Sequence, residues 1–147
     1  MTSCLADNQY MNYQELASGH LNDLLTSQIE VGDRSLRVWL ALTDEQKQIG
    51  LSFQSSLELD GMLFVYKQNV QTAFTFVNCD IDLNIEWFNA GGELITAGIG
   101  AAGGDQPYFC TEPFRFVLET KLTERKETSS HDNKLRLPYE ILKFADG

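Results

Sequence analysis

The alternation of apolar side chains changes its phase between residues 71 and 88, and this change constrains the fold more than any other sequence feature. Phe74 and Phe76 are bulky and apolar at even positions, whereas the next apolar residues stand at the odd positions 81, 83, 85 and 87. Because successive side chains of a strand point to opposite faces, one uninterrupted strand cannot bury both sets. We therefore predict a turn or bulge around Asn78, Cys79 and Asp80, since Asn and Asp tolerate such a break.

Short segments with similar alternation occur along most of the chain. We predict strands at 36–42, 62–66, 71–77, 81–88, 93–97, 114–120 and 135–144, with a hairpin turn at Asn89-Ala90-Gly91-Gly92. Many short strands separated by turn signals favour a mainly β fold, a compact antiparallel β-sandwich or barrel, over βαβ units.

Two helices are predicted beside these strands. Apolar residues between Tyr13 and Leu25 recur at steps of three and four, which is typical of an amphipathic helix. Thr43 and Gln46 form a capping box that begins a short helix, and Gly50 ends it. We predict an N-terminal helical extension over residues 1–27 and a single β domain over residues 28–147.

The charge balance excludes several classes of partner. The chain of 147 residues carries 21 Asp and Glu against 11 Lys and Arg, a formal net charge of −10. Such a charge repels phosphate backbones and anionic lipid, so we expect no nucleic-acid partner. No apolar run approaches the ~20 residues that cross a bilayer, so we expect no membrane span.

The cysteines and histidines indicate neither a metal site nor a catalytic pair. No Cys-x-x-Cys pair occurs among the three cysteines, Cys4, Cys79 and Cys110. The two histidines, His20 and His131, lie in polar segments. We interpret the thiols as small buried side chains and predict no metal, no cofactor and no catalytic residues. Whether Cys79 and Cys110 pair stays open.

The start of the chain is similar to the end of a bacterial lipoprotein cleavage box, in which two small residues precede a lipidated cysteine. Thr2 and Ser3 precede Cys4 in this way, but the sequence contains no charged and apolar signal regions before them. Two expectations stay open: lipidation at Cys4 with a cell-envelope or extracytoplasmic location, or a native start at Met1 and a cytoplasmic protein.

A glycine motif at residues 98–103 matches the spacing G-x-G-x-x-G. The dinucleotide-binding fingerprint also needs a helix that opens at the motif within a βαβ unit. Here Gly104-Asp105-Gln106-Pro107 follows without helical periodicity. We interpret the motif as a flexible glycine loop that rims a cleft.

Polar residues stand at every even position from 80 to 86: Asp80, Asp82, Asn84 and Glu86. Residues two apart on one strand lie ~7 Å apart, too far for two of them to share a calcium shell without loop ligands. We interpret these positions as the solvated face of a sheet. The alternative is a carboxylate-dependent hydrolase or carbohydrate-active protein that uses Asp80, Asp82 and Glu86.

Five blocks of sequence follow one another in a characteristic order: GLSFQ at 50–54, GMLFVY at 61–66, FTFVNC at 74–79, IDLNI at 81–85 and FVLE at 116–119. The series resembles the bacterial and archaeal family called "domain of unknown function 192" over about residues 28–120. The resemblance implies a compact, mostly β fold of jelly-roll type with a short helix near its first strands, in proteins that are often exported. It implies no reaction, cofactor or partner.

The polar positions of the family differ in this sequence. The two arginines that usually flank the first block are replaced by Ile49 and Gln54, the usual Asn-Thr reads Asn78-Cys79, and the usual Asp of the fourth block is Asn84. Since an amide cannot replace an ion pair or a proton acceptor, a site that depends on Arg and Asp would be lost or altered here.

The leading hypothesis is a non-catalytic β-sandwich binding or interaction module that recognises a small molecule, a glycan or a protein. Two further hypotheses are the carboxylate-dependent hydrolase or carbohydrate-active protein and a structural component of an envelope or virion. The candidate binding residues are Asn78, Asn84, Gln54, Asp80 and Asp82.

Overall fold

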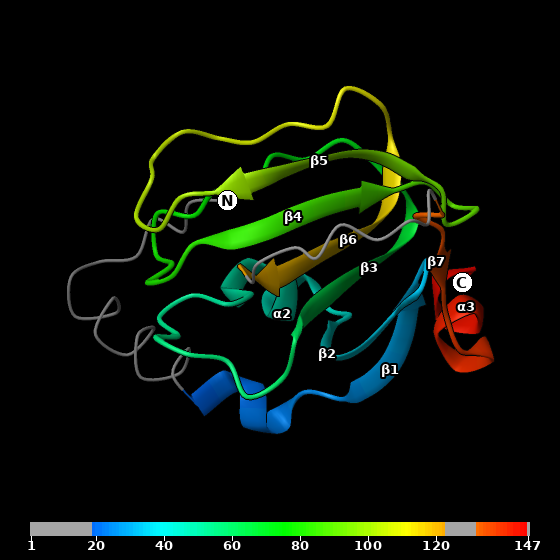
Figure 1. Cartoon of the computed structure of the whole chain (residues 1–147), viewed down its shortest axis with the longest axis horizontal. Helices are drawn as coiled ribbons and strands as arrows, with labels where there is room; N and C mark the ends of the chain where they lie inside the picture. The colour runs from blue at the N-terminus through cyan, green and yellow to red at the C-terminus, as the bar shows by residue number, and fades with distance from the viewer. Residues whose placement is uncertain (1–18, 123–131, 147) are drawn as a thin grey trace.

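The computed structural model describes residues 19–122 and 132–146, in which seven strands form one sheet curled into a half-barrel (Figure 1). The strands lie in the order β5-β4-β6-β3-β2-β1-β7. Their bounds are β1 (Thr26–Val31), β2 (Arg34–Ala41), β3 (Gly61–Val70), β4 (Leu83–Phe88), β5 (Leu94–Gly100), β6 (Phe114–Lys121) and β7 (Leu135–Arg136). The helical elements are η1 (His20–Asp23), α2 (Asp44–Ile49) and α3 (Tyr139–Ala145).

The sheet is mixed, because β2 and β3 run parallel while its other paired strands are antiparallel. The mainly β class is thus confirmed, but the fully antiparallel arrangement predicted from the sequence is wrong at this pair. Parallel neighbours need a crossover connection, and here the connection contains α2. No helix in the described part of the chain is long and apolar enough to cross a membrane.

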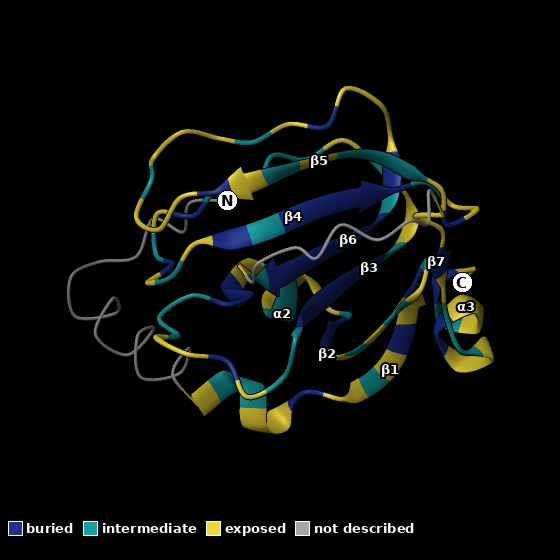
Figure 2. Ribbon diagram, viewed as in Figure 1, coloured by how far each residue is buried: buried dark blue, intermediate teal, exposed yellow. Residues whose placement is uncertain are grey.

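Apolar residues cover both sides of the central strands β3, β4 and β6, which are mostly buried (Figure 2). We call one side the Glu119 face, where the side chains of Met62, Phe64, Ile85 and Trp87 pack in one core cluster. We call the other the Glu86 face, with the cluster of Val38, Leu40, Leu63, Phe88 and Leu118. A strand buried on both faces leaves little room for charge, so an acid in it needs an explanation.

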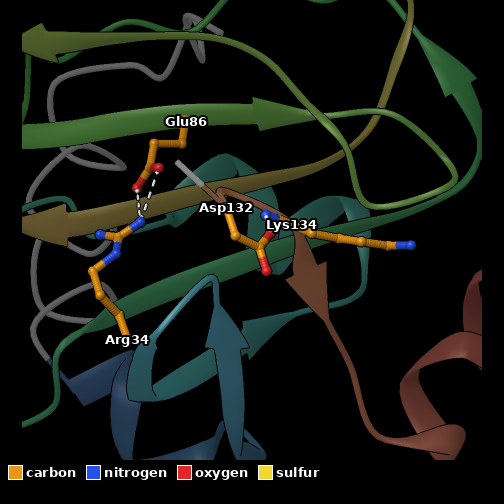
Figure 3. A network of polar contacts seen from close by, with 4 residues as sticks. All are labelled: Arg34, Glu86, Asp132 and Lys134. Atoms are coloured by element: carbon orange, nitrogen blue, oxygen red, sulfur yellow. Dashed lines mark hydrogen bonds and ion pairs between the residues drawn. The ribbon is translucent and has the colours of Figure 1, made fainter. Parts of the chain in front are cut away.

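One ion pair crosses the Glu86 face. The Arg34 Nη2 atom lies 3.1 Å from Oε2 and 3.2 Å from Oε1 of Glu86, and Figure 3 shows Arg34 reaching from β2 toward β4. These two strands are separated in the sheet by β6 and β3. Because the sheet curls toward this face, the two side chains meet and join the arms of the half-barrel. The solvated face predicted for residues 80–86 is therefore wrong at Glu86, which is buried.

The helix α2 begins and ends as the sequence predicts. The Thr43 hydroxyl accepts a hydrogen bond from the Gln46 N–H, and Gln46 Oε1 accepts from the Thr43 N–H, so the capping box is formed. Gly50 follows Ile49 as the C-cap with a positive φ of 52°. These contacts satisfy backbone groups that a short helix would otherwise leave without partners.

Replacing Thr43 by alanine removes the hydroxyl acceptor from this capping box. We expect Thr43→Ala to lower the free energy of unfolding by about 1 kcal/mol, whereas Thr43→Ser, which keeps the acceptor, should cost less. Urea denaturation of the three proteins measures the difference. Equal losses in both variants would show that the hydroxyl bond contributes nothing.

The break predicted around Asn78, Cys79 and Asp80 is confirmed by a turn that includes Asn78, although the segment before it is not a full strand. A turn at residues 77–78 lets the Cys79 N–H donate to the Phe76 carbonyl at 3.0 Å. Before the turn, Phe74 forms only an isolated bridge with Tyr108. The strand predicted at 71–77 is therefore wrong, because this segment pairs at one point with a loop rather than with a neighbouring strand.

The predictions for the two ends of the chain also differ from the structure. The strand predicted at 135–144 is only two residues long, and α3 follows Pro138 and buries Ile141 and Ala145 one helical turn apart. Near the other end, β1 (Thr26–Val31) was not predicted, and its first two residues fall in the predicted helical extension over residues 1–27. Of the predicted amphipathic helix, the residues before 19 lie outside the described residues, and the described part is the short η1.

Only part of the glycine motif is a loop, because its first three residues belong to the sheet. Gly98 and Gly100 belong to β5, and a Cβ atom added at Gly100 would lie 2.4 Å from the Phe76 ring. The glycine thus provides the space in which this fully buried ring packs. The interpretation of residues 98–103 as one flexible loop is wrong for the first three residues, and no helix opens at the motif, as predicted.

Candidate functional site

Glu119 lies on β6, between β4 and β3, directly after the apolar residues Val117 and Leu118. In the strand register it stands between Met62 of β3 and Ile85 of β4, and both of these side chains are fully buried. The Glu119 residue itself is only 4% exposed. A carboxyl group has thus been placed among apolar side chains on the Glu119 face.

The carboxyl of Glu119 has no hydrogen bond or ion pair with any residue of the described segments. Burial without a partner penalises the charged form and raises the pKa of Glu119 to about 8. At neutral pH this group is therefore mostly a protonated acid, which can both donate and accept a hydrogen bond.

Glu119 lines a small cavity of about 50 Å³, which we call the inner cavity. Its wall is formed by the C-terminal part of α2 and the residues after it, by β3, and by the segment around the turn at residues 77–78. The lining side chains with polar or aromatic groups include Lys47, Ser52, Phe64, Tyr66, Thr72, Phe74, Asn78 and Cys79. This volume holds one or two water molecules or the end of a ligand.

The negative charge of Glu119 affects two other groups that line this cavity. It contributes to raising the pKa of Tyr66 and of Cys79, in each case after the larger effect of burial. The pKa of Cys79 rises to about 12, so its thiol stays protonated and is a poor nucleophile. Cys79 and Cys110 are both buried and free, which confirms the prediction of small buried thiols for this pair.

A wider groove of about 660 Å³ adjoins the inner cavity, and we call it the outer groove. The two share the lining residues Lys47, Gln48, Tyr66 and Thr72. At this junction the Lys47 Nζ atom lies 4.2 Å from the centre of the Tyr66 ring, at cation–π distance. Burial lowers the pKa of Lys47, although Asp44 opposes the shift.

The backbone beside the inner cavity is strained at one residue. Phe53 has a φ of 62°, a conformation that bulky side chains rarely adopt. Its N–H donates to the Asn78 carbonyl at 2.9 Å, so it joins the segment after α2 to the turn. Strained residues of this kind are common at ligand-binding sites, where surrounding contacts hold them in place.

Comparisons with known proteins identify the family. The family model described as DUF192, uncharacterized ACR, matches residues 27–130, more than half of the chain. The chain belongs to the DUF192 family. The family resemblance given by the sequence is thereby confirmed, and a search of curated proteins gives no significant match.

Two solved structures share the fold of this DUF192 chain. One is a protein of unknown function from Novosphingobium aromaticivorans DSM 12444, with 23% identity, a TM-score of 0.63, and coverage of 67% of this chain and 74% of the other. The second is described as a candidate transcription regulator from Sinorhizobium meliloti 1021, with 19% identity, a TM-score of 0.64, and coverage of 67% and 81%. At these identities the likeness concerns the fold alone.

The residues predicted as a binding site lie at separate places in this DUF192 domain. Asn78 lines the inner cavity, whereas the half-buried Gln54 is not among its lining residues. Asn84 is on β4 with its side chain on the Glu86 face, as the alternation with Leu83 and Ile85 requires. The structure therefore does not bring Asn84 to the inner cavity.

The predicted acidic residues also separate. Asp80 and Asp82 are exposed, and an Asp82 oxygen accepts a hydrogen bond from the Ala102 N–H at 2.8 Å. Neither of them, nor Glu86, lines the inner cavity or the outer groove. Cys4, predicted as a lipidation site, lies outside the described residues.

Sequence reasoning missed Glu119, Lys47 and Tyr66 as site residues. For Glu119 a signal was present, because this acid directly follows the apolar residues Val117 and Leu118 within a predicted strand. Lys47 has the pattern of an ordinary surface cation on a short helix. No group of three metal-binding side chains occurs among the residues that the structure describes.

Proposed function

We propose that this DUF192 chain is a non-catalytic ligand-binding domain, and that the end of its ligand enters the inner cavity and contacts Glu119. The observation that carries this proposal is the buried carboxyl without a partner. A ligand group that pairs with this carboxyl supplies the hydrogen bond or ion pair that the described residues do not give it. The outer groove supplies further contact area, because it opens directly beside the cavity.

The chemistry of the lining supports binding rather than catalysis. The residues that line the inner cavity include no histidine, and the protonated thiol of Cys79 is not an activated nucleophile. A hydrolase built on Asp80, Asp82 and Glu86 has less support, since Glu86 is already paired with Arg34. Paired acids of a glycosidase must instead face each other across a cleft.

A screen tests the proposal directly. We expect a thermal-shift screen of amines, carboxylic acids, sugars, short peptides and divalent ions to contain compounds that raise the melting temperature of the wild-type chain. The same compounds should have a smaller effect on Glu119→Gln, because the amide cannot ionise. The exposed Glu140 offers a matched control, Glu140→Gln, which should respond like wild type. Stabilisation by no class of compound, or equal stabilisation of all three proteins, would contradict the proposal.

The buried acid also predicts how stability depends on pH. Between the ordinary pKa of 4.5 and the folded-state pKa of about 8, the unfolded chain releases the Glu119 proton while the folded chain keeps it. Raising the pH through this range therefore favours unfolding, and the effect levels off above pH 8. We expect the stability of wild type relative to Glu119→Gln to fall steadily across this range.

Urea denaturation at several pH values measures this difference, since the other titrating groups are shared by both proteins and cancel. Glu140→Gln serves again as the control for removal of one acidic group. A constant difference between wild type and Glu119→Gln from pH 5 to pH 8 would show that the folded-state pKa of Glu119 is not raised.

A further inference from the structure

We propose that the ligand of the inner cavity carries a primary alkylammonium group, which forms an ion pair with the Glu119 carboxylate. This inference rests on the proposed function and names the chemical class that the site takes. This ligand class is supported by the carboxyl of Glu119, which has no partner among the described residues, and by the aromatic side chains that line the other walls of the cavity.

The lining matches the two interactions that an ammonium group needs. A buried carboxylate neutralises its charge, and aromatic faces attract it through their ring quadrupoles. Phe64, Phe74 and Tyr66 supply aromatic rings in the inner cavity, and Phe64 and Phe74 pack edge to face with centroids 5.3 Å apart. The Lys47 ammonium already lies over the Tyr66 ring at the entrance, so Phe64 and Phe74 are the lining rings left for a ligand cation.

The shapes of the two spaces indicate how such a ligand lies. An inner volume of about 50 Å³ admits an ammonium with a short piece of alkyl chain, and the outer groove has room for the rest. Leu42, Val70 and Phe144 give that groove apolar walls suited to methylene groups. Along the outer groove, Lys47 and Lys67 repel any further positive charge on the ligand, so the ligand is a monoamine over this stretch.

The net charge of the whole chain favours this class over an anionic ligand, although the outer groove itself is lined by Lys47 and Lys67 and by one acid, Asp44. The net charge of −10 attracts cations and repels anions at long range. A carboxylate ligand would meet a neutral or negative Glu119 and gain only one hydrogen bond from it. On binding, the ligand enters as the ammonium cation, the O–H bond of the Glu119 carboxyl breaks and its proton passes to solvent water, and no other covalent bond changes.

This proton release predicts a pH dependence. The titratable groups that face the cavity are Lys47 from α2, Tyr66 from β3, Cys79 from the turn segment, and Glu119 itself. Tyr66 and Cys79 stay protonated throughout the neutral range, because burial raises the pKa of both. The affinity should therefore rise about tenfold for each pH unit below the pKa of Glu119 and level off above it.

Isothermal titration calorimetry with n-butylamine, n-butanol and butyrate tests the ligand class, in phosphate buffer rather than in a buffer that contains a primary amine. We expect butylamine to bind most tightly, with tighter binding at pH 7 than at pH 6 and a plateau near pH 8. Repeating the titration in buffers of different ionisation enthalpy should detect the released proton. Glu119→Gln should lose at least tenfold in affinity together with the pH dependence, and Glu140→Gln should lose neither.

A free alkylamine and a lysine side chain of another protein share this chemistry, and Nα-acetyl-lysine methylamide distinguishes them. Binding of this compound at least as tight as that of butylamine would identify the lysine side chain as the source. Binding of butylamine alone would identify a free amine. Either result supports an alkylammonium ligand.

The ligand class is overturned if butanol or butyrate binds as tightly as butylamine, if the affinity does not change with pH, or if none of the probes binds. In the first of these cases a loss of binding in Glu119→Gln would leave the proposed function intact. If none of the three probes binds and no compound in the thermal-shift screen stabilises the chain, both the ligand class and the proposed function are overturned. Circular dichroism of Glu119→Gln separates a loss of binding from a loss of folding.

Discussion

Phe76→Ala is expected to lower the free energy of unfolding by about 4 kcal/mol, the largest effect of a single substitution that we predict. The Phe76 ring is fully buried, packs edge to face against Tyr108 with centroids 5.2 Å apart, and lies directly against Gly100. Removing it leaves a cavity beside β5 and releases the turn segment that borders the inner cavity. Urea denaturation with a two-state fit measures the loss.

Two glycines of the motif provide matched variants for this contact. A Cβ atom at Gly100 would overlap the Phe76 ring, so Gly100→Ala should cost about 2 kcal/mol by overpacking. A Cβ atom at Gly98 would meet nothing closer than Ile85 Cγ2 at 4.0 Å. Gly98→Ala should therefore leave stability unchanged or raise it by about 0.5 kcal/mol.

The double variant Phe76→Ala/Gly100→Ala tests the coupling of the two positions. Once the ring is removed, the added methyl group has space, so the alanine at position 100 should cost almost nothing in that background. Additive losses would show that Gly100 is needed for another reason. Equal effects of alanine at positions 98 and 100 would contradict the packing explanation of the motif.

Arg34→Met is expected to lower the free energy of unfolding by about 3 kcal/mol, because it leaves the buried Glu86 carboxylate without its cation. Glu86 is 2% exposed, whereas the Arg34 side chain is 35% exposed. This partial exposure places the expected loss at the lower end of the range for a broken buried pair. The substitution also removes the contact that joins β2 to β4 across the half-barrel.

The control is the double variant Arg34→Met/Glu86→Leu, which replaces the pair with apolar side chains. Since the cost of Arg34→Met arises mainly from a stranded charge, the second substitution should recover most of the lost stability. Thermal and urea denaturation of the single and double variants complete a double-mutant cycle. A double variant less stable than Arg34→Met would show that the pair itself supplies the stability.

The alternation of side chains is sufficient to predict most of the sheet. The break near Asn78, the capping box at Thr43 and the hairpin between β4 and β5 are confirmed, the hairpin by the hydrogen bond from the Asn89 N–H to the Glu93 carbonyl at 3.0 Å. Each of these depends on neighbours within a few residues. The prediction is wrong at residues 135–144, where Pro138 and the helical spacing of Ile141 and Ala145 favour α3 over a strand.

Residues 80 to 86 show the limit of prediction from the alternation of side chains. Their alternation correctly indicates that Glu86 and Asn84 share one side of β4, but it cannot show that Arg34 lies opposite Glu86. The same limit applies to Glu119, whose importance comes from Met62 and Ile85 on the two adjacent strands.

The sequence by itself determined the family, the mainly β class, the break near Asn78 and the start of α2, because these follow from patterns that neighbouring residues create together. Only the tertiary structure decided that β2 and β3 are parallel, that Glu86 is paired, and that Glu119 faces a cavity without a partner among the described residues. The physical reason is that burial and charge pairing depend on side chains that lie far apart in the chain and meet only when the sheet curls.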